Sequence, residues 1–217
     1  MAKFEIVVAS DKHFGFVDEI CRQIEESAKA RGTGIAKRSP EYIKQKMVEG
    51  KAVIAVSEKN EFGGFCYVES WADKKFVANS GLIVVPEFRK LGLAHKIKER
   101  AFKLSRELFP NAKLFGLTTS LAVMKINSDL GYRPVTFSEL TEDEKFWDGC
   151  KSCVNYDILT RTNKKHCLCT GMLYDPNEKS KHQKKKFLDY KDKYKNWLKI
   201  KRDLLFAKFL KDPVENK

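Results

Sequence analysis

The hydrophobic period of the sequence changes within one stretch, residues 79–109, and this change constrains the fold most. Leu82 to Val85 form a branched apolar run that favours a β-strand. Pro86 ends the strand, because proline lacks an amide donor and restricts the residue before it. From residue 95 on, apolar residues recur at steps of three and four, which predicts an amphipathic helix. The charged residues of that helix are expected on its exposed face: Lys96, Lys98, Glu99, Arg100 and Lys103.

The turn between this strand and this helix has the composition of an anion-binding site. The unpaired amides at a helix N-terminus and the helix dipole both favour an anion. Gly92 and Ala94 carry little or no side chain, so a pyrophosphate can approach the backbone. Arg89 and Lys90 add positive charge beside it. The stretch therefore predicts a phosphate-binding junction.

The residues of this junction form the pattern Val-x-Pro-x-x-Arg-x-x-Gly-x-Ala between a strand and a helix. The pattern resembles the acetyl-CoA-binding motif of the GNAT superfamily of N-acetyltransferases. The resemblance implies acetyl-CoA as the donor, with succinyl-CoA as the alternative. It also implies that the strand backbone pairs with the pantetheine arm and that the turn binds the pyrophosphate. The implied cofactor-binding residues are Leu82, Ile83, Val84, Arg89, Lys90, Leu91, Gly92, Leu93, Ala94 and His95, with Ser120 and Asn127 on a later helix.

The fold class implied by this resemblance is α/β (α+β) in three layers. A mixed, mostly antiparallel central sheet would carry helices on both faces. The periodicities fit this order, with strands expected at 4–9, 51–57, 64–71, 76–85 and 113–119 and helices at 14–28, 39–50, 95–109 and 120–130. The fifth strand is expected to run parallel to the fourth. Further strands are expected at 132–140, 154–160 and 166–174, the last two as a hairpin around Asn163 and Lys164.

The chain divides by composition into a domain at 1–177 and a basic extension at 178–217. The extension holds 14 Lys/Arg against 6 Asp/Glu and spaces its aromatic residues by three or four, which predicts a long helix over 179–211. One interpretation is that its aromatic stripe packs on the domain or on a second subunit of a homodimer. The other is contact with RNA or an acidic partner, in which lysines neutralise phosphates.

Six cysteines occur without a secretory signal, so we expect reduced thiols in a cytoplasmic protein. No window of the sequence is apolar over the length that spans a bilayer, so no membrane partner is expected.

Acetyl transfer to an amine needs a proton acceptor for the amine and a proton donor for the departing thiolate. In many members of the superfamily, the helix after the fifth strand carries an Asn that contacts the cofactor arm and, seven residues on, a Tyr that protonates the thiolate. Ser120 and Asn127 stand at these positions here, so the general acid is unassigned and solvent is the alternative. Glu69 is the candidate base, and His13 and His95 are weaker candidates. The alternatives are that Glu69 is an ordinary strand-end carboxylate and that water relays the proton.

The acceptor is expected at the loop between the first two helices, where Arg31 and Arg38 flank Thr33. An arginine fork suits a carboxylate, so a small acidic amino acid such as glutamate is the substrate hypothesis, and an uncommitted surface cluster is the alternative. The segments RGTGIAKRSPEYI, FGLTTSLAVMKINSDLGY and FWDGCKSCVNYDIL resemble a GNAT subgroup associated with arginine biosynthesis. Competing hypotheses are acetylation of a protein or polyamine and a non-catalytic acyl-CoA-binding or RNA-associated protein.

Cys150-x2-Cys153 and Cys167-x-Cys169 supply four thiols, enough in number for a structural zinc. In the expected hairpin, however, Cys169 lies about 17 Å from Cys153, too far to share a metal. We therefore expect no metal site, and small buried thiols instead. A longer loop in place of the hairpin is the alternative that would bring the four thiols together.

Overall fold

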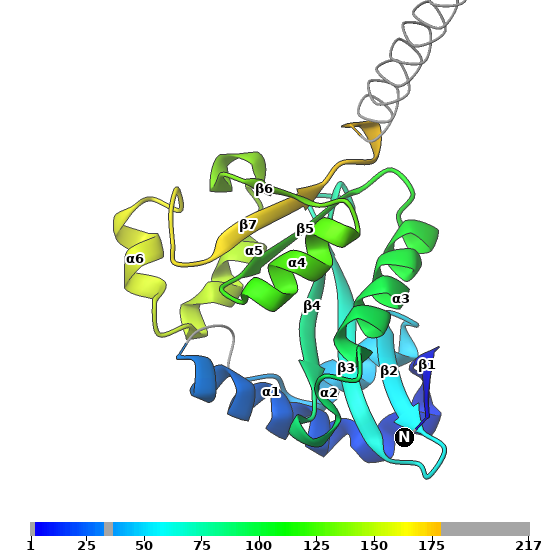
Figure 1. Ribbon diagram of the computed structural model, residues 1–217. Coiled ribbons are helices and arrows are strands. Elements are labelled where there is room, and N and C mark those ends of the chain that lie inside the picture. Colours follow the sequence, from blue (N-terminus) through cyan, green and yellow to red (C-terminus); the bar gives the residue numbers. More distant parts are fainter. Residues whose placement is uncertain (1–2, 33–36, 179–217) are drawn as a thin grey trace, which may run out of the picture. The chain divides into compact units, whose positions relative to one another are not determined.

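The computed structural model describes residues 3–32 and 37–178 (Figure 1). Residues Met1–Asp175 belong to one compact unit, and the chain from Pro176 on belongs to another. The helix expected over 179–211 and the candidate residue Thr33 lie outside the described residues. None of the described helices combines the length and the hydropathy that a membrane span needs.

Seven described strands form one sheet in the order β1-β2-β3-β4-β5-β7-β6. Every neighbouring pair is antiparallel except β4 and β5, which are parallel, as expected. The strands are β1 (Phe4–Val8), β2 (Ala52–Ser57), β3 (Phe62–Trp71), β4 (Phe76–Val84), β5 (Lys113–Thr118), β6 (Arg133–Val135) and β7 (Thr170–Tyr174). The helices are α1 (Val17–Arg31), α2 (Pro40–Val48), α3 (Leu93–Leu108), α4 (Leu121–Asp129), α5 (Glu144–Asp148) and α6 (Tyr156–Arg161), with 3-10 turns at Asp11–Phe16, Pro86–Phe88, Phe137–Glu139 and Gly149–Ser152.

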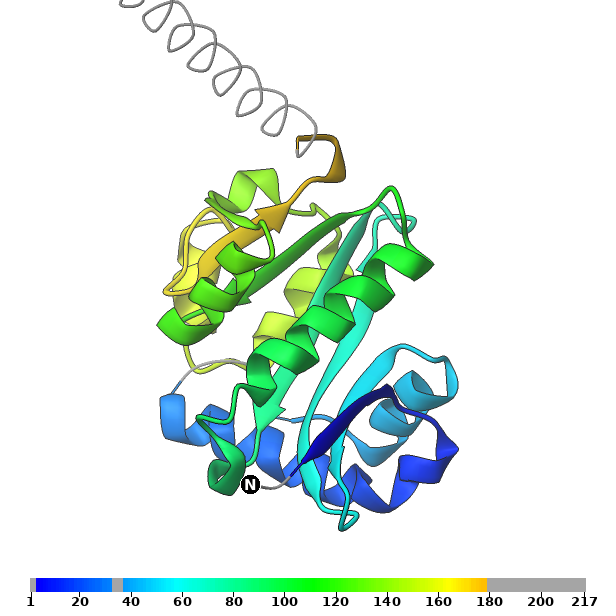
Figure 2. The same ribbon diagram turned by 45° about the vertical axis from the view of Figure 1, so that its right-hand side comes forward.

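One face of the sheet is covered by α3 and α4 (Figure 2). The three- and four-residue steps of α3 bring Ile97, Ala101 and Leu104 onto the sheet, where they join Val53 and Val77 in one core cluster. Met124 of α4 packs against the same cluster. This layer contains the predicted strand-turn-helix junction.

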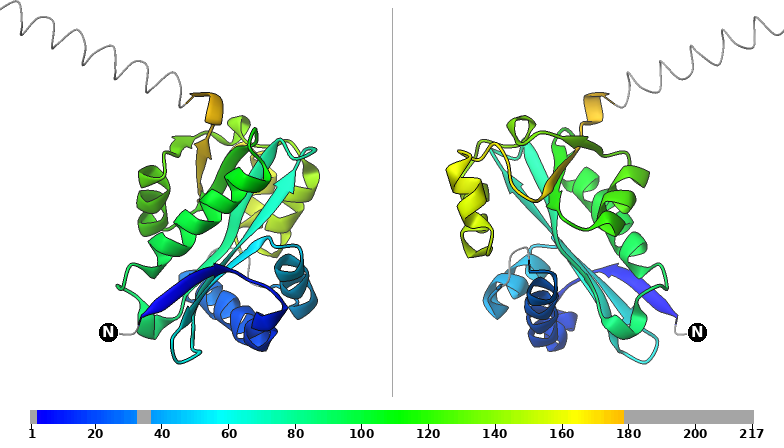
Figure 3. Two further views of the ribbon diagram at one scale, coloured as in Figure 1. Left: turned by 90° about the vertical axis from the view of Figure 1, so that its right-hand side faces the viewer. Right: turned by 60° about the vertical axis from the view of Figure 1, so that its left-hand side comes forward.

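The opposite face is covered by two separate groups of helices (Figure 3). Ile20 of α1 and Ile43 of α2 pack on the β2–β3 half of the sheet. Trp147 of α5 and Leu159 of α6 pack with Phe115 on the β5–β7 half. The predicted three-layer, mostly antiparallel architecture with helices on both faces is therefore confirmed.

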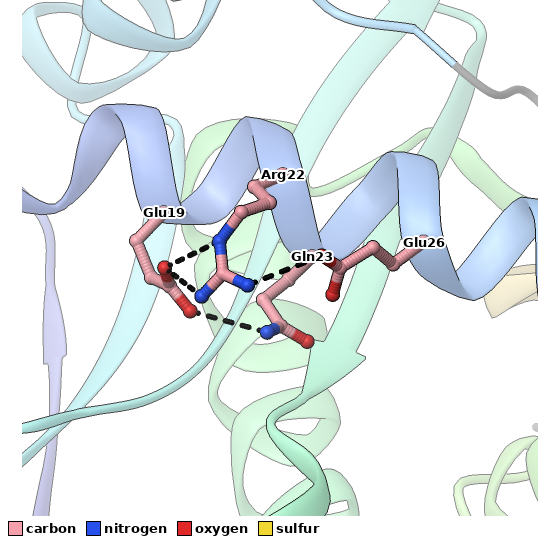
Figure 4. Close-up of polar contacts among 4 residues, drawn as sticks. All are labelled: Glu19, Arg22, Gln23 and Glu26. Atoms are coloured by element: carbon pink, nitrogen blue, oxygen red, sulfur yellow. Dashed lines mark hydrogen bonds and ion pairs between the residues drawn. The ribbon is translucent and has the colours of Figure 1, made fainter.

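The outer face of α1 carries charged residues at helical spacing (Figure 4). Arg22 donates to Glu19 and to Glu26, and the Gln23 amide donates to Glu19 over 3.1 Å. Solvent screens exposed pairs of this kind, so they contribute little to stability. The position of α1 therefore depends on its buried apolar side.

Strands β4 and β5 pair only briefly and then diverge (Figure 1). Their register covers residues 76–78 of β4 and 113–115 of β5. Beyond this point β4 carries an irregularity, because Ile83 opposes Phe65 while Ser80 opposes Tyr67. Gly81, between them, has a φ of +64°, a value that glycine adopts at low cost. The two strands thus form a V that opens between the two helical groups.

Three expectations about strands are wrong. Where a strand was expected at 154–160, residues Tyr156–Arg161 form the helix α6, so the hairpin around Asn163 and Lys164 does not exist; both residues lie after α6 with positive φ. The last strand starts only at Thr170. The strand expected at 132–140 stops at Val135, because Thr136 and Glu139 form a capping box around a 3-10 turn.

We expect Gly81→Ala to lower the free energy of unfolding by about 1–3 kcal/mol. An added Cβ would lie 2.6 Å from Cε1 of the Tyr67 ring, in a backbone conformation that alanine adopts poorly. Gly15→Ala is the control, because a Cβ there meets nothing within 4 Å. Chemical denaturation measures both variants, and a Gly81→Ala protein as stable as the wild type would contradict this reading of the bulge.

Candidate active site

A cavity of about 630 Å³ lies at the divergence of β4 and β5. Its lining comes from both strands, from α1 and α2 on one side, and from α3 and α4 behind the sheet. Of the predicted site residues, the cavity brings together Arg31, Arg38, Glu69, Leu82, Ile83, Ser120 and Asn127. Val84 and residues 89–95 do not line it. The cavity therefore connects the predicted acceptor side with part of the predicted cofactor side.

Residues 89–95 form the turn and first helical residues that the sequence predicts. Gly92 is the N-cap of α3 with a φ of +75°, and no side chain caps the helix. The first turn of α3 contains no acidic residue, so its free amides and dipole favour an anion. Arg89 and Lys90 are exposed beside it, and Arg89 donates to the Val84 carbonyl over 3.2 Å. The residues present fit a phosphate-bearing ligand.

On the α1–α2 side of the cavity, Arg38 is held by two aromatic residues. Its Nε donates to the Tyr67 hydroxyl over 2.8 Å, and its guanidinium lies 5.6 Å from the Tyr42 ring centroid. These contacts reduce the freedom of a long side chain before any ligand binds. Arg31 is more exposed, and burial followed by the positive charge of Arg89 lowers its pKa.

Glu69, the candidate base, is bound at the same end of the cavity. The Tyr42 hydroxyl donates to its carboxylate, and Lys46 Nζ lies 3.4 Å from the same oxygen. Burial, with the nearby Tyr67 and Glu69, raises the pKa of Tyr42, so Tyr42 remains a neutral donor. The carboxylate is therefore oriented by a phenol and an ammonium.

Lys98 does not lie on the exposed face of α3, where the sequence-based expectation placed it. Its side chain is 2% exposed and lines the cavity, and its Nζ lies 3.5 Å from the carbonyl oxygen of Asn79. Burial lowers the pKa of Lys98 to about 8. The position of Lys98 in the sequence could have indicated this burial. Lys98 directly follows buried Ile97 and lies three residues before buried Ala101, so it shares the buried face of the helix.

Asn79 is the centre of a buried polar network at the point where the strands part. Its side-chain Nδ2 donates to the Ser105 hydroxyl over 2.7 Å, and its side-chain Oδ1 accepts from the Tyr132 hydroxyl over 3.4 Å. Burial raises the pKa of Tyr132, which keeps this phenol protonated. The sequence analysis missed this network, because its members are far apart in the chain.

Asn127 and Ser120 both lie on the α4 side of the cavity. Ser120 is the N-cap of α4 and accepts from the Val123 amide over 3.4 Å. Asn127 is 2% exposed, and among the described residues its Oδ1 is the buried side-chain polar atom that has no hydrogen-bond partner. An unpartnered acceptor at a cavity wall suits a ligand with an N–H or O–H donor.

Four cysteines line the same cavity: Cys150, Cys153, Cys167 and Cys169. The distance argument against a shared metal depended on the hairpin, which is wrong, because α6 lies between the two pairs. Within residues 3–32 and 37–178, however, no group of three or more His, Cys, Asp or Glu side chains is placed to hold a metal ion. All six cysteines of the chain are free thiols.

No protein-family model and no curated protein sequence matches the chain. Among solved structures, N-acetylglutamate synthase from Neisseria gonorrhoeae, complexed with coenzyme A and N-acetyl-glutamate, matches with a TM-score of 0.57 at 18% identity, over 81% of this chain and 35% of that one. A GNAT-family acetyltransferase from Staphylococcus aureus matches with a TM-score of 0.53 at 13% identity, over 65% and 91%. A Salmonella typhimurium protein with its cofactor acetyl-CoA matches with a TM-score of 0.56 at 12% identity, over 80% and 94%.

This chain thus spans about a third of the length of the N-acetylglutamate synthase that it matches. At these identities the similarity establishes the fold, and the expected GNAT fold is confirmed.

We expect alkylation of Cys150 and Cys169 to accelerate about tenfold per pH unit between pH 7 and 9, because the thiolate is the reactive form. Burial, followed by the neighbouring cysteines, raises the pKa of Cys150 to about 11 and that of Cys169 to about 12. Mass spectrometry of iodoacetamide-treated protein measures the rates, with N-acetylcysteine as the control thiol. A rate that levels off near pH 8.5, as for an ordinary thiol, would contradict the raised values.

Proposed function

We propose that this protein is an acyl-CoA-dependent N-acetyltransferase that acetylates the amine of a small acidic amino acid such as glutamate. One observation carries the proposal. A single cavity extends from a cationic acceptor side, through the divergence of β4 and β5, to the cofactor side formed by α3 and α4. Two substrates can therefore meet at the sheet without a covalent enzyme intermediate.

The donor side is argued from the chain's own groups. The free amides of α3, with Arg89 and Lys90, would bind the phosphates, and the backbone of Leu82 to Val84 would hold the pantetheine arm. When bound, acetyl-CoA supplies an acetyl group activated as a thioester. The solved structures with the same fold that contain CoA or acetyl-CoA support this choice of donor. Succinyl-CoA stays the alternative.

The acceptor side is argued from charge. Among the described residues that line the cavity, one carboxylate faces five cationic side chains: Glu69 against Arg31, Lys37, Arg38, Lys98 and Lys145. Such a balance favours an acceptor that carries carboxylates and opposes a polyamine. Arg38, already held by Tyr67 and Tyr42, can present its remaining donors to a carboxylate. The match to an N-acetylglutamate synthase agrees with this substrate class.

Glu69 is the proposed base, because an acidic amino acid carries an ammonium group that must lose a proton before attack. Tyr42 and Lys46 hold the carboxylate of Glu69, which lines the cavity. A water molecule between Glu69 and the amine would serve the same step.

A non-catalytic acyl-CoA-binding protein is the second candidate. Asn127 favours it, because an amide stands where related enzymes carry a proton-donating tyrosine, and an amide does not protonate a thiolate. The turnover experiment below separates the two candidates.

We expect thiol release from acetyl-CoA with glutamate, and Arg38→Ala to raise the KM for glutamate about 10- to 100-fold, the loss that a charge-assisted hydrogen bond to a carboxylate predicts. The panel is glutamate, aspartate, ornithine, lysine, spermidine and a lysine peptide, with succinyl-CoA in parallel and products identified by mass. Arg22→Ala, on the outer face of α1, is the control. Acetyl-CoA binding without turnover of any acceptor would replace the enzyme by the second candidate, and a preference for spermidine would overturn the acidic substrate.

We expect Glu69→Gln to reduce kcat about 100-fold or more while the Kd for acetyl-CoA stays unchanged, since only proton transfer is lost. Exposed Glu58→Gln is the control, because Glu58 pairs with Lys3 at 3.3 Å on the surface. An unchanged kcat in Glu69→Gln would show that another group, or water alone, accepts the proton.

A further inference from the structure

The strands that bound the cavity part at a defined residue, and a lysine lies there. Pairing between β4 and β5 ends at Ala78 and Phe115. Asn79 is the first β4 residue past this point, and its main-chain carbonyl oxygen lies 3.5 Å from Lys98 Nζ. Lys98 comes from α3, the helix whose N-terminus is the proposed phosphate site. The amine therefore lies in the angle of the V, on the cofactor side.

Burying the Lys98 ammonium at this place lowers the stability of the fold. It is 2% exposed, and no carboxylate lies within ion-pair distance of it in the described part of the chain. Its contact with the Asn79 main-chain carbonyl oxygen is long at 3.5 Å. The neutral Cys66 thiol and the Tyr132 ring, 5.5 Å away, also face it. A buried ammonium with so few partners costs stability, whereas an apolar side chain of similar size would not. A ligand with an acceptor atom at this position would supply the missing partner.

A second observation points to a ligand beside Lys98. The main-chain carbonyl of Asn127 accepts from the amide of Tyr132, the residue whose ring lies 5.5 Å from Lys98 Nζ. Asn127 lines the cavity from α4, is 2% exposed, and has an unpartnered Oδ1. Lys98 offers a donor and Asn127 an acceptor, so the two side chains together suit a ligand that carries both an acceptor atom and an N–H group. A thioester beside an amide has this character.

We propose that Lys98 is the general acid that protonates the departing thiolate, and that Asn127 accepts from an amide N–H of the pantetheine arm. This inference rests on the proposed acyltransferase function. It supplies the proton donor that no tyrosine of α4 provides.

The proposed step balances as follows. The substrate ammonium first gives one proton to Glu69, which later returns it to solvent. The neutral amine nitrogen then forms a bond to the acetyl carbon and loses its second proton to water. The carbon–sulfur bond breaks, its electron pair stays on sulfur, and Lys98 gives that sulfur a proton. Solvent returns a proton to the neutral Lys98 amine. No oxidant or metal takes part.

The acidity of Lys98 suits this role. Its pKa of about 8 is close to that of a thiol, which is the match that favours proton transfer near neutral pH. The titratable groups that face it are the Cys66 thiol of β3, whose pKa burial raises to about 11, and the Tyr132 phenol after α4. Both are neutral where Lys98 titrates. Activity that needs the ammonium form is therefore present below about pH 8 and lost above it.

The test compares wild type with Lys98→Met, an apolar side chain of similar length, and with Lys103→Met as the control on the exposed face of α3. We expect kcat in Lys98→Met to fall about 100-fold and its decline above about pH 8 to disappear. The Kd for acetyl-CoA should change little. Lys103→Met should keep the rate and pH profile of the wild type.

A binding readout is independent of turnover. The thiol of bound CoA is titrated by its thiolate absorbance, as the difference between protein with and without CoA. An adjacent ammonium stabilises the thiolate, so we expect the pKa of the bound thiol to lie about one unit below that of free CoA in wild type. In Lys98→Met it should return to the free value or above. If Lys98→Met does not fold, the wild-type titration still tests the proposal.

The outcomes separate the two proposals. No turnover with any acceptor, together with a lowered bound-thiol pKa that depends on Lys98, would overturn the proposed acetylation but keep Lys98 beside the sulfur. Turnover with an unshifted thiol, or an unchanged kcat in Lys98→Met, would overturn the role of Lys98 and leave the acetyltransferase intact.

Discussion

The divergence of β4 and β5 is the constraint on which the rest of the structure depends. Two parallel strands that stayed paired would leave no cavity between them, and the backbone of β4 would be occupied by β5. The irregularity at Gly81 bends β4 at a place where Tyr67 leaves no room for a Cβ. The sheet therefore keeps one opening, and helices from both faces contribute side chains to it.

The opening leaves backbone groups of the two strands without a strand partner. Backbone groups that lose a strand partner must find another, and at the angle of the V Lys98 provides one for the main-chain carbonyl of Asn79. A fully apolar lining would be more stable, but it would bind neither an acid nor an amide. Polar groups concentrated at one position of an otherwise apolar core are typical of a binding site, and the proposed chemistry uses Lys98 among them.

Much of the fold could be predicted from the sequence, because long periodic segments determine their own structure. The change of period within residues 79–109 predicted β4, the turn and α3, and Gly92 was correctly expected at the turn. The predictions for short segments were wrong. The six residues of α6 bury only Leu159, and alternating branched residues there imitate a strand. Lys98 was misassigned by its residue type although its position lies on the buried side of α3. Asn79, Ser105 and Tyr132 meet only through tertiary structure, so no local pattern could have joined them.

The central claim is that acetyl-CoA lies in the V, with its arm along β4 and its phosphates on α3. Hydrogen exchange measured by mass spectrometry, with and without acetyl-CoA, tests this most directly. The account predicts slower exchange in peptides that cover residues 81–85 and 89–96, and little change in the exposed turns of the β1–β2 half of the sheet. Binding that leaves both peptides unchanged, or that protects a different part of the chain, would contradict it.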